Sequence, residues 1–332
     1  MRGRRLATLL LLAGLALLAG LLIHYDLPNI AEAFSAAGWG VAAVAAFHLV
    51  PLVADAAAWR ILVPPPDRLP LAAAVRLRWM AESVNALLPT ASVGGEFVRA
   101  RLAAREGVRP TTAGASVIVD VTLGLITQAA FALIGLVLLA RLDGAGSGLV
   151  LSIALGLGAF SLLAGLLLLV QHKGAFAFLT ARIERVTDAR RWPGLAAGGA
   201  RLDRAIEGLY RRSGPVLRSG LWRMAGWILG AGEIWLALRF LGHPVDLADA
   251  VVVESLIQAV RTAAFLVPAG VGVQEGAFIL VAGALGVPAA PALALALVKR
   301  AREILLGVPG LMAWQAGEAT RLRRDREPSQ SG

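Results

Sequence analysis

Two interrupted apolar stretches constrain the fold of this chain more than any other feature. In each, a glutamate follows a proline by seven residues, and a Gly-Val pair follows the glutamate by eleven. The first copy runs from Pro89 through Glu96 to Val108, and the second, 179 residues later, runs from Pro268 through Glu275 to Val287. Proline and glycine interrupt helices, and a carboxylate inside an apolar stretch is costly and therefore usually functional. Such paired interruptions predict an internal duplication of the kind found in membrane transporters.

Composition indicates that lipid surrounds most of the chain. The 332 residues are 58% hydrophobic and 16% charged, with a mean hydropathy of +0.71. A soluble domain cannot bury that much apolar surface. The net charge of +10 comes from arginines in the connections between apolar segments, which is typical of cytoplasmic loops and argues against nucleic acid as a partner. Because the sequence has no cysteine, disulfides, thiol chemistry and cysteine metal sites are excluded.

The apolar pattern predicts an all-α polytopic integral membrane protein. About six segments are long enough to cross the bilayer: Leu6–Ile23, Trp39–Val63, Thr111–Ala140, Leu149–Val170, Leu221–Leu241 and Ala289–Ala316. The first begins like a signal peptide, but its length and the lack of a cleavage site favour a retained helix. Two re-entrant helical hairpins are predicted, Leu71–Leu88 with Gly95–Gly107 and Ala250–Val267 with Gly276–Leu285. Their irregular tips must be buried in protein or line a cavity, because lipid cannot satisfy broken backbone.

Charge distribution predicts how this single membrane domain (1–332) is organised. It divides into repeat 1 (about 39–141), a cytoplasmic basic loop (about 171–220), repeat 2 (about 221–316) and a basic tail (317–332). The positive-inside tendency places both termini in the cytoplasm and the Lys/Arg-free links His24–Gly38 and Gly242–Asp249 outside. Three full spans separate the hairpins, so the hairpins enter from opposite sides. The two repeats are therefore predicted to have inverted topology.

The hairpin tips contain the first candidate functional residues. They are predicted at Pro89, Gly94, Gly95, Pro268, Gly270 and Gly272. Glu96 and Glu275 follow these glycines, each at the start of a half-helix. A carboxylate there either caps the helix, where the helix dipole favours it, or handles substrate or protons. The two roles are compatible.

Further ionisable residues lie in or near the predicted spans. Glu82 and Arg261 each precede their proline by seven residues, so opposite charges at equivalent positions predict an intramembrane ion pair, either a structural clasp or part of a path. Asn85 adds a neutral hydrogen-bonding group one turn after Glu82. Near the middle of the last span lie four ionisable groups, Lys299, Arg300, Arg302 and Glu303, and Asp120 is the equivalent of Lys299 in the first repeat.

Two interpretations of the Lys299–Glu303 cluster remain open. Guanidinium forks match phosphate oxygens, so the cluster could bind an anionic head group. The alternative is internal pairing with Asp120, Glu96 and Glu275. His48 and Asp55 share a helix face and Glu233 lies in another span; the first two form either a proton relay or a local packing pair. Nothing resembles a nucleotide loop, a metal-ligand cluster or a Ser-His-Asp set, so no catalytic residue, cofactor, metal or enzyme activity is expected.

Several of these motifs resemble those of a known family. The stretch Glu82-Ser-Val-Asn-Ala-Leu-Leu-Pro89, continued by Gly94-Gly95-Glu96 and Val98-Arg99, resembles the signature of the lysylphosphatidylglycerol synthase transmembrane, or flippase-like, superfamily. Val267-Pro-Ala-Gly-Val-Gly-Val-Gln-Glu275-Gly resembles its second signature. With Arg78-Trp79, Ala115-Ser-Val-Ile-Val-Asp120 and Leu297-Val-Lys-Arg-Ala-Arg-Glu303, the chain is most similar to the hopanoid-biosynthesis-associated HpnL branch. The family motif maps onto Asn85, Pro89, Gly95, Glu96, Pro268, Gly270, Gly272, Glu275 and Arg300.

The resemblance implies a multi-pass protein of the bacterial inner membrane that moves lipids between leaflets in the context of hopanoid metabolism. Its expected partners are membrane lipids, with a hopanoid or an anionic lipid as candidates. Sixteen residues follow Ala316, so the soluble aminoacyl-transfer domain of full-length synthases is not expected. Two alternatives remain: a non-transporting scaffold for lipid-biosynthetic proteins that acts through the basic loop, and an intramembrane lipid-modifying enzyme.

Overall fold

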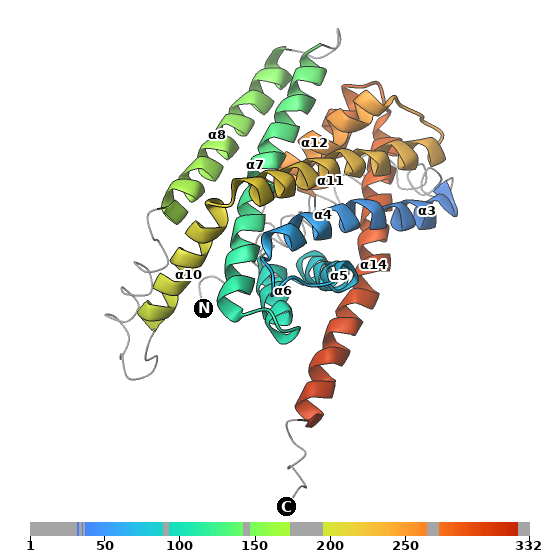
Figure 1. Ribbon diagram of the computed structural model, residues 1–332. Helices are drawn as coiled ribbons and strands as arrows, with labels where there is room; N and C mark the ends of the chain where they lie inside the picture. Colours follow the sequence, from blue (N-terminus) through green and yellow to red (C-terminus); the bar gives the residue numbers. More distant parts are fainter. Residues whose placement is uncertain are drawn as a thin grey trace, which may run out of the picture.

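The computed structural model describes residues 32, 35, 37–88, 93–141, 147–172, 195–263 and 272–324. Within these residues every regular element is a helix (Figure 1). The helices are α3 (Gly40–Phe47), α4 (Leu49–Leu62), α5 (Leu71–Leu87), α6 (Gly94–Arg105), α7 (Pro110–Ala140), α8 (Ser147–His172), α10 (Leu195–Tyr210), α11 (Ser213–Phe240), α12 (Leu247–Ala263), α13 (Val273–Gly283) and α14 (Ala289–Arg324).

The helices follow the predicted apolar segments closely. The predicted hairpin arms coincide with α5, α6, α12 and α13. Two segments of the described chain are long and apolar enough to cross a membrane, the joined α3–α4 segment Gly40–Leu62 and α7. The predicted first span Leu6–Ile23 and the tip residues Pro89, Pro268 and Gly270 lie outside the described residues.

The segment predicted as a basic loop contains regular structure. Helix α10 lies within it, and α11 begins at Ser213, eight residues before the predicted start of its span. Apolar residues of α10 recur at helical spacing, and Ile206 and Leu209 are buried against α7 together with Leu62. Arg201 and Arg204 of α10 are exposed, so the helix is amphipathic, with an apolar face against α7 and a polar face away from it.

The predicted span Trp39–Val63 is interrupted at His48. Pro51 has no N–H, so the carbonyl of Phe47 cannot receive its usual helical bond. Backbone bonds continue on both sides, from the His48 N–H to the Val44 carbonyl (3.0 Å) and from the Leu52 N–H to the His48 carbonyl (3.2 Å). His48 therefore lies at a helix junction inside an apolar segment, between α3 and α4.

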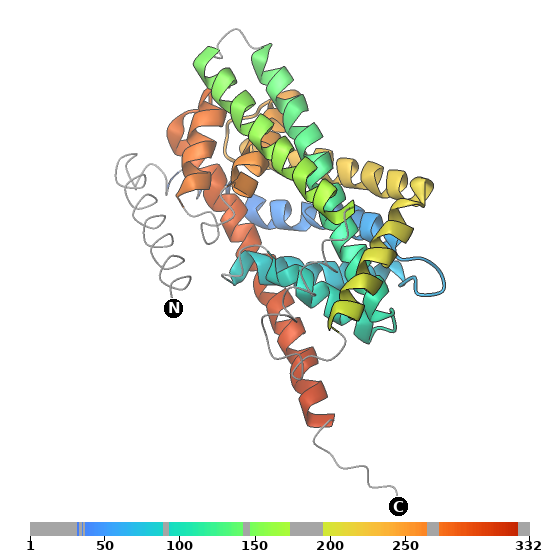
Figure 2. The ribbon, with the colours of Figure 1, turned by 90° about the vertical axis from the view of Figure 1, so that its left-hand side faces the viewer.

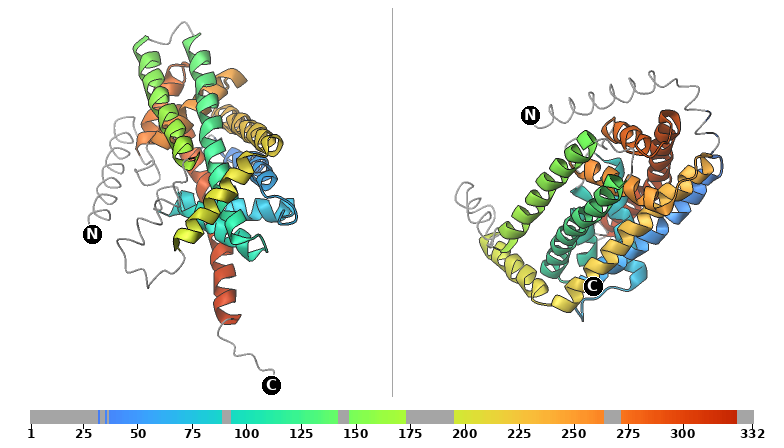
Figure 3. Two further views of the ribbon diagram at one scale, coloured as in Figure 1. Left: turned by 60° about the vertical axis from the view of Figure 1, so that its left-hand side comes forward. Right: turned by 90° about the horizontal axis from the view of Figure 1, so that it is seen from above.

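The two predicted halves pack against each other reciprocally. Helix α4 lies along α11, α5 packs on α14, and α7 packs on α12. The second and third of these contacts exchange places when the halves are exchanged, as a duplicated architecture requires. Figures 1 and 2 show that α7 and α14 run in opposite directions. The right-hand view of Figure 3 shows α11 beside α3 and α4.

Glycines permit the close approach of helices from different halves. A Cβ at Gly232 would lie 2.7 Å from the Phe47 ring, and one at Gly40 would lie 2.3 Å from the Phe240 ring. On α14, a Cβ at Gly310 would lie 2.1 Å from the Ser83 hydroxyl of α5. Small residues of this kind let helix backbones approach in membrane proteins. The halves are thus joined by tight contacts on either side of a polar centre.

Candidate functional site

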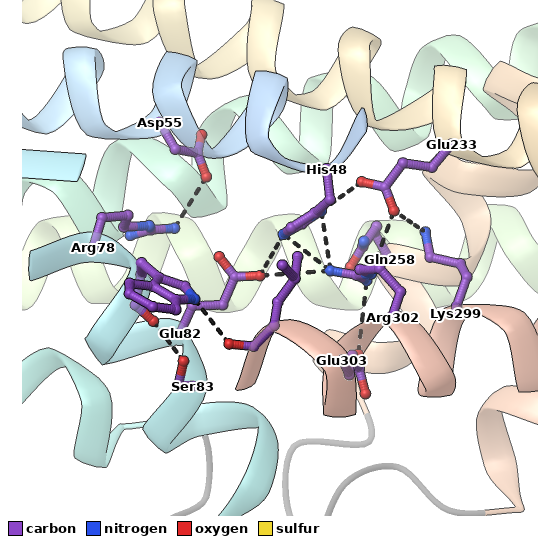
Figure 4. A network of polar contacts seen from close by, with 12 residues as sticks. His48, Asp55, Arg78, Glu82, Ser83, Glu233, Gln258, Lys299, Arg302 and Glu303 are labelled. Carbon is purple, nitrogen blue, oxygen red and sulfur yellow. Dashed lines mark hydrogen bonds and ion pairs between the residues drawn. The ribbon is translucent and has the colours of Figure 1, made fainter. Parts of the chain in front are cut away.

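A polar cavity of about 170 Å³ lies where α4, α5, α11, α12 and α14 meet (Figure 4). Each helix contributes residues three, four or seven positions apart, which share one helix face. The ionisable and amide side chains that line it are His48, Asp55, Arg78, Glu82, Glu233, Glu254, Gln258, Arg261, Lys299 and Arg302. The cavity is therefore built from both predicted halves.

His48 is at the centre of the contacts. Its Nδ1 lies 2.6 Å from Oε1 of Glu233 on α11, and its Nε2 lies 2.7 Å from Oε1 of Glu82 on α5. Nη1 of Arg302 on α14 lies 3.0 Å from both ring nitrogens. Figure 4 shows the imidazole between the two carboxylates. One side chain at a helix junction thus connects four helices.

Helices α12 and α14 are joined by ion pairs, in which a cation of one helix meets a carboxylate of the other. Lys299 Nζ donates to Oε2 of Glu254 at 2.6 Å, and the same carboxylate accepts from the Gln258 amide. Arg261 donates to Glu303 at 2.7 Å. Lys299 and Arg302 are nearly buried, so each cation needs such a partner. The pairs satisfy charges that lipid cannot solvate.

A second network, which includes Asp55 and Arg78 of the cavity lining, holds the first hairpin. The Asp120 carboxylate of α7 accepts from Arg99 of α6 at 2.6 Å and lies 3.3 Å from Arg223 of α11. Arg223 also contacts Asp55 at 2.8 Å, and Arg78 contacts both aspartates. Arg99 is fully buried, packs over the Trp59 ring at 4.9 Å and pairs with Glu96. This network ties α4, α5, α6, α7 and α11 together.

The backbone N–H groups at the starts of the two half-helices donate to different side chains. The Gly272 N–H, at a backbone φ of +79° that favours glycine, donates to Oε2 of Glu275 at 2.7 Å. Arg300 of α14 pairs with the same carboxylate. In the first hairpin the Gly95 N–H donates instead to Asn85 Oδ1 at 2.8 Å. Glu275 therefore acts as a cap and an ion-pair partner at once, whereas Glu96 pairs with Arg99 and Asn85 supplies the hydrogen bond.

The expected partners of two charges differ from those observed. Among the ion pairs of the described residues, Glu82 and Arg261 do not pair with each other, because His48 and Arg302 lie beside Glu82 while Glu303 lies beside Arg261. The predicted ion pair between Glu82 and Arg261 is therefore wrong. Both side chains still line the same cavity.

The Lys299–Glu303 cluster is internally paired rather than a bare cationic patch. Its cations contact Glu254, Glu275 and Glu233. Asp120, the equivalent of Lys299, pairs with Arg99 and Arg223 instead of this cluster. His48 and Asp55 line one cavity but have separate partners.

Arg223 and Glu254 are buried members of these networks that we did not single out from the sequence. Arg223 lies inside a predicted span and Glu254 inside a predicted hairpin arm, and an ionisable residue in an apolar segment is the signal that identified Glu233. Within the described part of the chain, no three His, Asp or Glu side chains are grouped so as to hold a metal ion.

A smaller hollow of about 30 Å³ lies next to the cavity, between α5 and α14. It is lined by Trp79, Ser83 and Leu306 among others, and Trp79 Nε1 donates to the Leu306 carbonyl at 2.8 Å. The cavity and the hollow share His48, Glu82, Arg261 and Arg302. These four side chains therefore form a polar partition between the two spaces.

Comparison with known proteins gives one family match. The sequence model described as the lysylphosphatidylglycerol synthase TM region matches residues 6–310. Comparison with curated proteins and with solved structures gave no match. The matched range includes all the residues that line the cavity.

Proposed function

Because this chain belongs to the family of the lysylphosphatidylglycerol synthase transmembrane region, we propose that it moves a lipid head group between the leaflets of a bacterial inner membrane. Membership of this family indicates a membrane protein that acts in lipid metabolism or transport. The finer role, lipid translocation linked to hopanoid metabolism, rests on the motif resemblance described above and on the cavity between the halves. We propose the HpnL-like branch on the same grounds.

The observation that carries this proposal is the polar cavity. Ionisable side chains inside a membrane protein are costly, and they typically mark the path of a substrate or ion. Secondary transporters place such sites between related halves near interrupted helices. The volume of about 170 Å³ holds a group the size of about five or six water molecules. A small polar head group fits this space while its apolar chains stay in the surrounding lipid.

The charges of the cavity lining narrow the choice of head group further. Apart from His48, the cavity lining has as many carboxylates as permanent cations, Asp55, Glu82, Glu233 and Glu254 against Arg78, Arg261, Lys299 and Arg302, and each of these cations has a carboxylate partner. A strongly anionic group would have to displace one of these carboxylates from its cation. A neutral, hydroxyl-rich or zwitterionic group can instead exchange hydrogen bonds with both signs. This favours a hopanoid-type or zwitterionic lipid over the anionic lipid considered from sequence.

The test is leaflet exchange of labelled lipids in proteoliposomes, with a variant that fills the cavity and leaves every charge in place. Gly230 of α11 lines the cavity, and a Cβ there would lie 3.5 Å from Glu254, so Gly230→Leu places a larger side chain in the space. Gly220 lies on the same helix, and a Cβ added there would meet no atom within 4 Å, so Gly220→Leu is the matched control.

We expect exchange by the wild type and the Gly220→Leu variant, and its loss in Gly230→Leu. The lipid panel contains hopanoid, zwitterionic and anionic species, and a preference for the anionic species would contradict the charge argument. If folded wild-type protein exchanges no lipid, with or without a proton gradient, the scaffold hypothesis replaces transport. A new lipid product in place of exchange would indicate an enzyme.

A further inference from the structure

Both ring nitrogens of His48 face carboxylate oxygens at hydrogen-bond distance, 2.6 Å to Glu233 and 2.7 Å to Glu82. A carboxylate only accepts hydrogen bonds, and a neutral imidazole has a single N–H to donate. With a neutral ring, one nitrogen lone pair would point at a carboxylate oxygen. Both carboxylate contacts are satisfied when both nitrogens carry hydrogen, and the Arg302 Nη1 that lies 3.0 Å from each nitrogen then faces the ring as a like charge. His48 thus has the arrangement of an imidazolium shared by two glutamates.

The charges of the connected network support the same protonation. His48 belongs to an ion-pair network with four carboxylates and three permanent cations: Glu82, Glu233, Glu254 and Glu303 against Arg261, Lys299 and Arg302. Arg300, on the same helix face as Glu303, is matched by Glu275. The neighbouring network of Asp55, Glu96 and Asp120 with Arg78, Arg99 and Arg223 is balanced by itself. A proton on His48 makes the His48 network neutral, which a low-dielectric interior favours.

We propose that His48, held between Glu82 and Glu233, is the binding site of a coupling proton, and that loss of this proton opens the partition between the cavity and the smaller hollow. This inference rests on the proposed transport function and names its coupling ion. His48, Glu82 and Arg302 line both spaces, so any change in their contacts changes the partition. The proton leaves to cavity water and is replaced from the opposite side.

Arg302 is the cation that can replace His48 at the two carboxylates once His48 has lost its proton. It lies 3.6 Å from Oε1 of Glu82 and 3.5 Å from Oε2 of Glu233, the two carboxylates that also hold His48. It opposes the imidazolium through like charge and competes for the same acceptors. When His48 loses its proton, the carboxylate left without a donor turns to Arg302. The link from α4 to α5 or α11 then breaks, while each glutamate keeps a partner.

The other charged groups around His48 already have partners of opposite charge. Lys299 pairs with Glu254 and lies 3.9 Å from Glu233, so its positive charge stabilises both carboxylates. Glu303 lies 3.9 Å from Arg302 and pairs with Arg261. Arg78 and Asp55 line the same cavity and pair with each other at 3.0 Å. The proton is thus the component of the network that can leave without unpairing a buried permanent charge.

The first experiment is nitrogen NMR of ¹⁵N-histidine protein in lipid nanodiscs, which reads the protonation of each ring nitrogen without any transport. The sequence has four histidines, and His48→Gln assigns the relevant signal. We expect both His48 nitrogens to be protonated at neutral pH, and an ordinary neutral ring in the Glu82→Gln/Glu233→Gln variant. A neutral His48 ring in the wild type overturns the proposal.

The second experiment measures lipid exchange under a pH difference across the proteoliposome membrane. We expect the gradient to change the wild-type rate and to have no effect on His48→Gln. His48→Arg keeps two donors and a permanent charge, so it tests the idea in a variant whose contacts to both glutamates persist; its rate should also ignore the gradient. The control is His243→Gln, at the α11–α12 connection, which should respond like the wild type.

The outcomes separate the two proposals. Exchange that ignores the gradient in the wild type overturns proton coupling and leaves the transport function intact. Absence of all exchange overturns transport, and the NMR result then shows by itself whether the proton site exists. Gradient dependence that persists in both His48 variants assigns the coupling proton to another group and contradicts the inference.

Discussion

At the scale of single residues, Asp120 is the buried carboxylate on which three arginines converge. It is fully buried, and its carboxylate is surrounded by three guanidinium groups, from Arg78, Arg99 and Arg223. Asp120→Asn removes the charge that compensates them, and breaking a buried pair in this way costs about 3–5 kcal/mol. We expect a large loss of thermal stability in detergent, measured by the aggregated fraction after heating.

The matched control for Asp120→Asn is Glu207→Gln, which breaks an exposed ion pair between Glu207 and Arg211 on α10. Exposed pairs at i,i+4 contribute about 0.3–0.5 kcal/mol. Its melting temperature should therefore stay close to that of the wild type. Equal losses in the two variants would contradict the assignment of Asp120 as the central charge of the buried network.

Glu275 combines a cap with an ion pair, and two substitutions separate these roles. Glu275→Gln keeps an oxygen that can accept from the Gly272 N–H but loses the charge opposite Arg300, whereas Glu275→Ala loses both. Loss of an N-terminal cap costs about 0.5–2 kcal/mol. We expect Glu275→Ala to unfold at a lower temperature than Glu275→Gln. Identical melting temperatures would show that the cap contributes nothing.

The location of the charged residues was predictable from sequence, and their partners were mostly not, although pairing of the Lys299–Glu303 cluster with Glu275 was among the interpretations and is observed. Ionisable residues inside apolar spans identified Glu82, Asp120, Glu233 and Lys299, since such positions are rare. Pairing depends on how each helix is rotated against helices that are distant in the sequence. A spacing of seven fixes the face of one helix and leaves that rotation open, which is why Glu82 was assigned to Arg261 although His48 is its neighbour.

At the scale of elements, the first hairpin depends on close contact between α5 and α6. A Cβ at Gly95 would lie 2.1 Å from the Ala81 carbonyl and 2.7 Å from the Asn85 amide. A backbone carbonyl cannot rotate away as a flexible side chain can, so Gly95→Ala should separate the arms at a cost of about 1–3 kcal/mol. We expect faster proteolysis of this hairpin and a lower melting temperature.

The control for Gly95→Ala is Gly276→Ala, in α13 of the second hairpin. A Cβ at Gly276 meets no atom within 4 Å. Alanine is the better helix former by about 0.5–1 kcal/mol, so this variant should be as stable as the wild type or more so. A destabilised Gly276→Ala protein would mean that the second hairpin is packed more tightly than the structure shows.

Element boundaries followed from the sequence where proline or glycine marks them, as at Pro64, Gly94 and Gly286. Helix α10 was missed because it lies in an arginine-rich stretch, where its short apolar face of Leu202, Ile206 and Leu209 is hard to recognise. The interruption at His48 was also missed, although Pro51 three residues later signals a lost backbone bond. This junction places His48, which the sequence indicated only as a relay or packing partner of Asp55, inside the polar centre between the halves.

At the scale of the whole molecule, the reciprocal packing of α5 on α14 and α7 on α12 joins the halves through exchanged contacts. Helices α7 and α14, which follow the two hairpins, run in opposite directions (Figure 2). If the direction of α7 approximates the membrane normal, the two hairpins enter from opposite sides. Inverted topology therefore has a definite experimental signature at the hairpin ends.

The absence of cysteine from the sequence makes that signature accessible, because any introduced cysteine is a unique label site. Arg68 and Glu106 are exposed residues that flank the first hairpin, and Asp246 and Pro288 flank the second. With inverted repeats, a membrane-impermeant thiol reagent applied to intact cells should label Asp246→Cys and Pro288→Cys. It should label Arg68→Cys and Glu106→Cys only in inside-out vesicles. Labelling of all four from one side would contradict inversion, and opposite sides within one pair would show that the hairpin crosses the membrane.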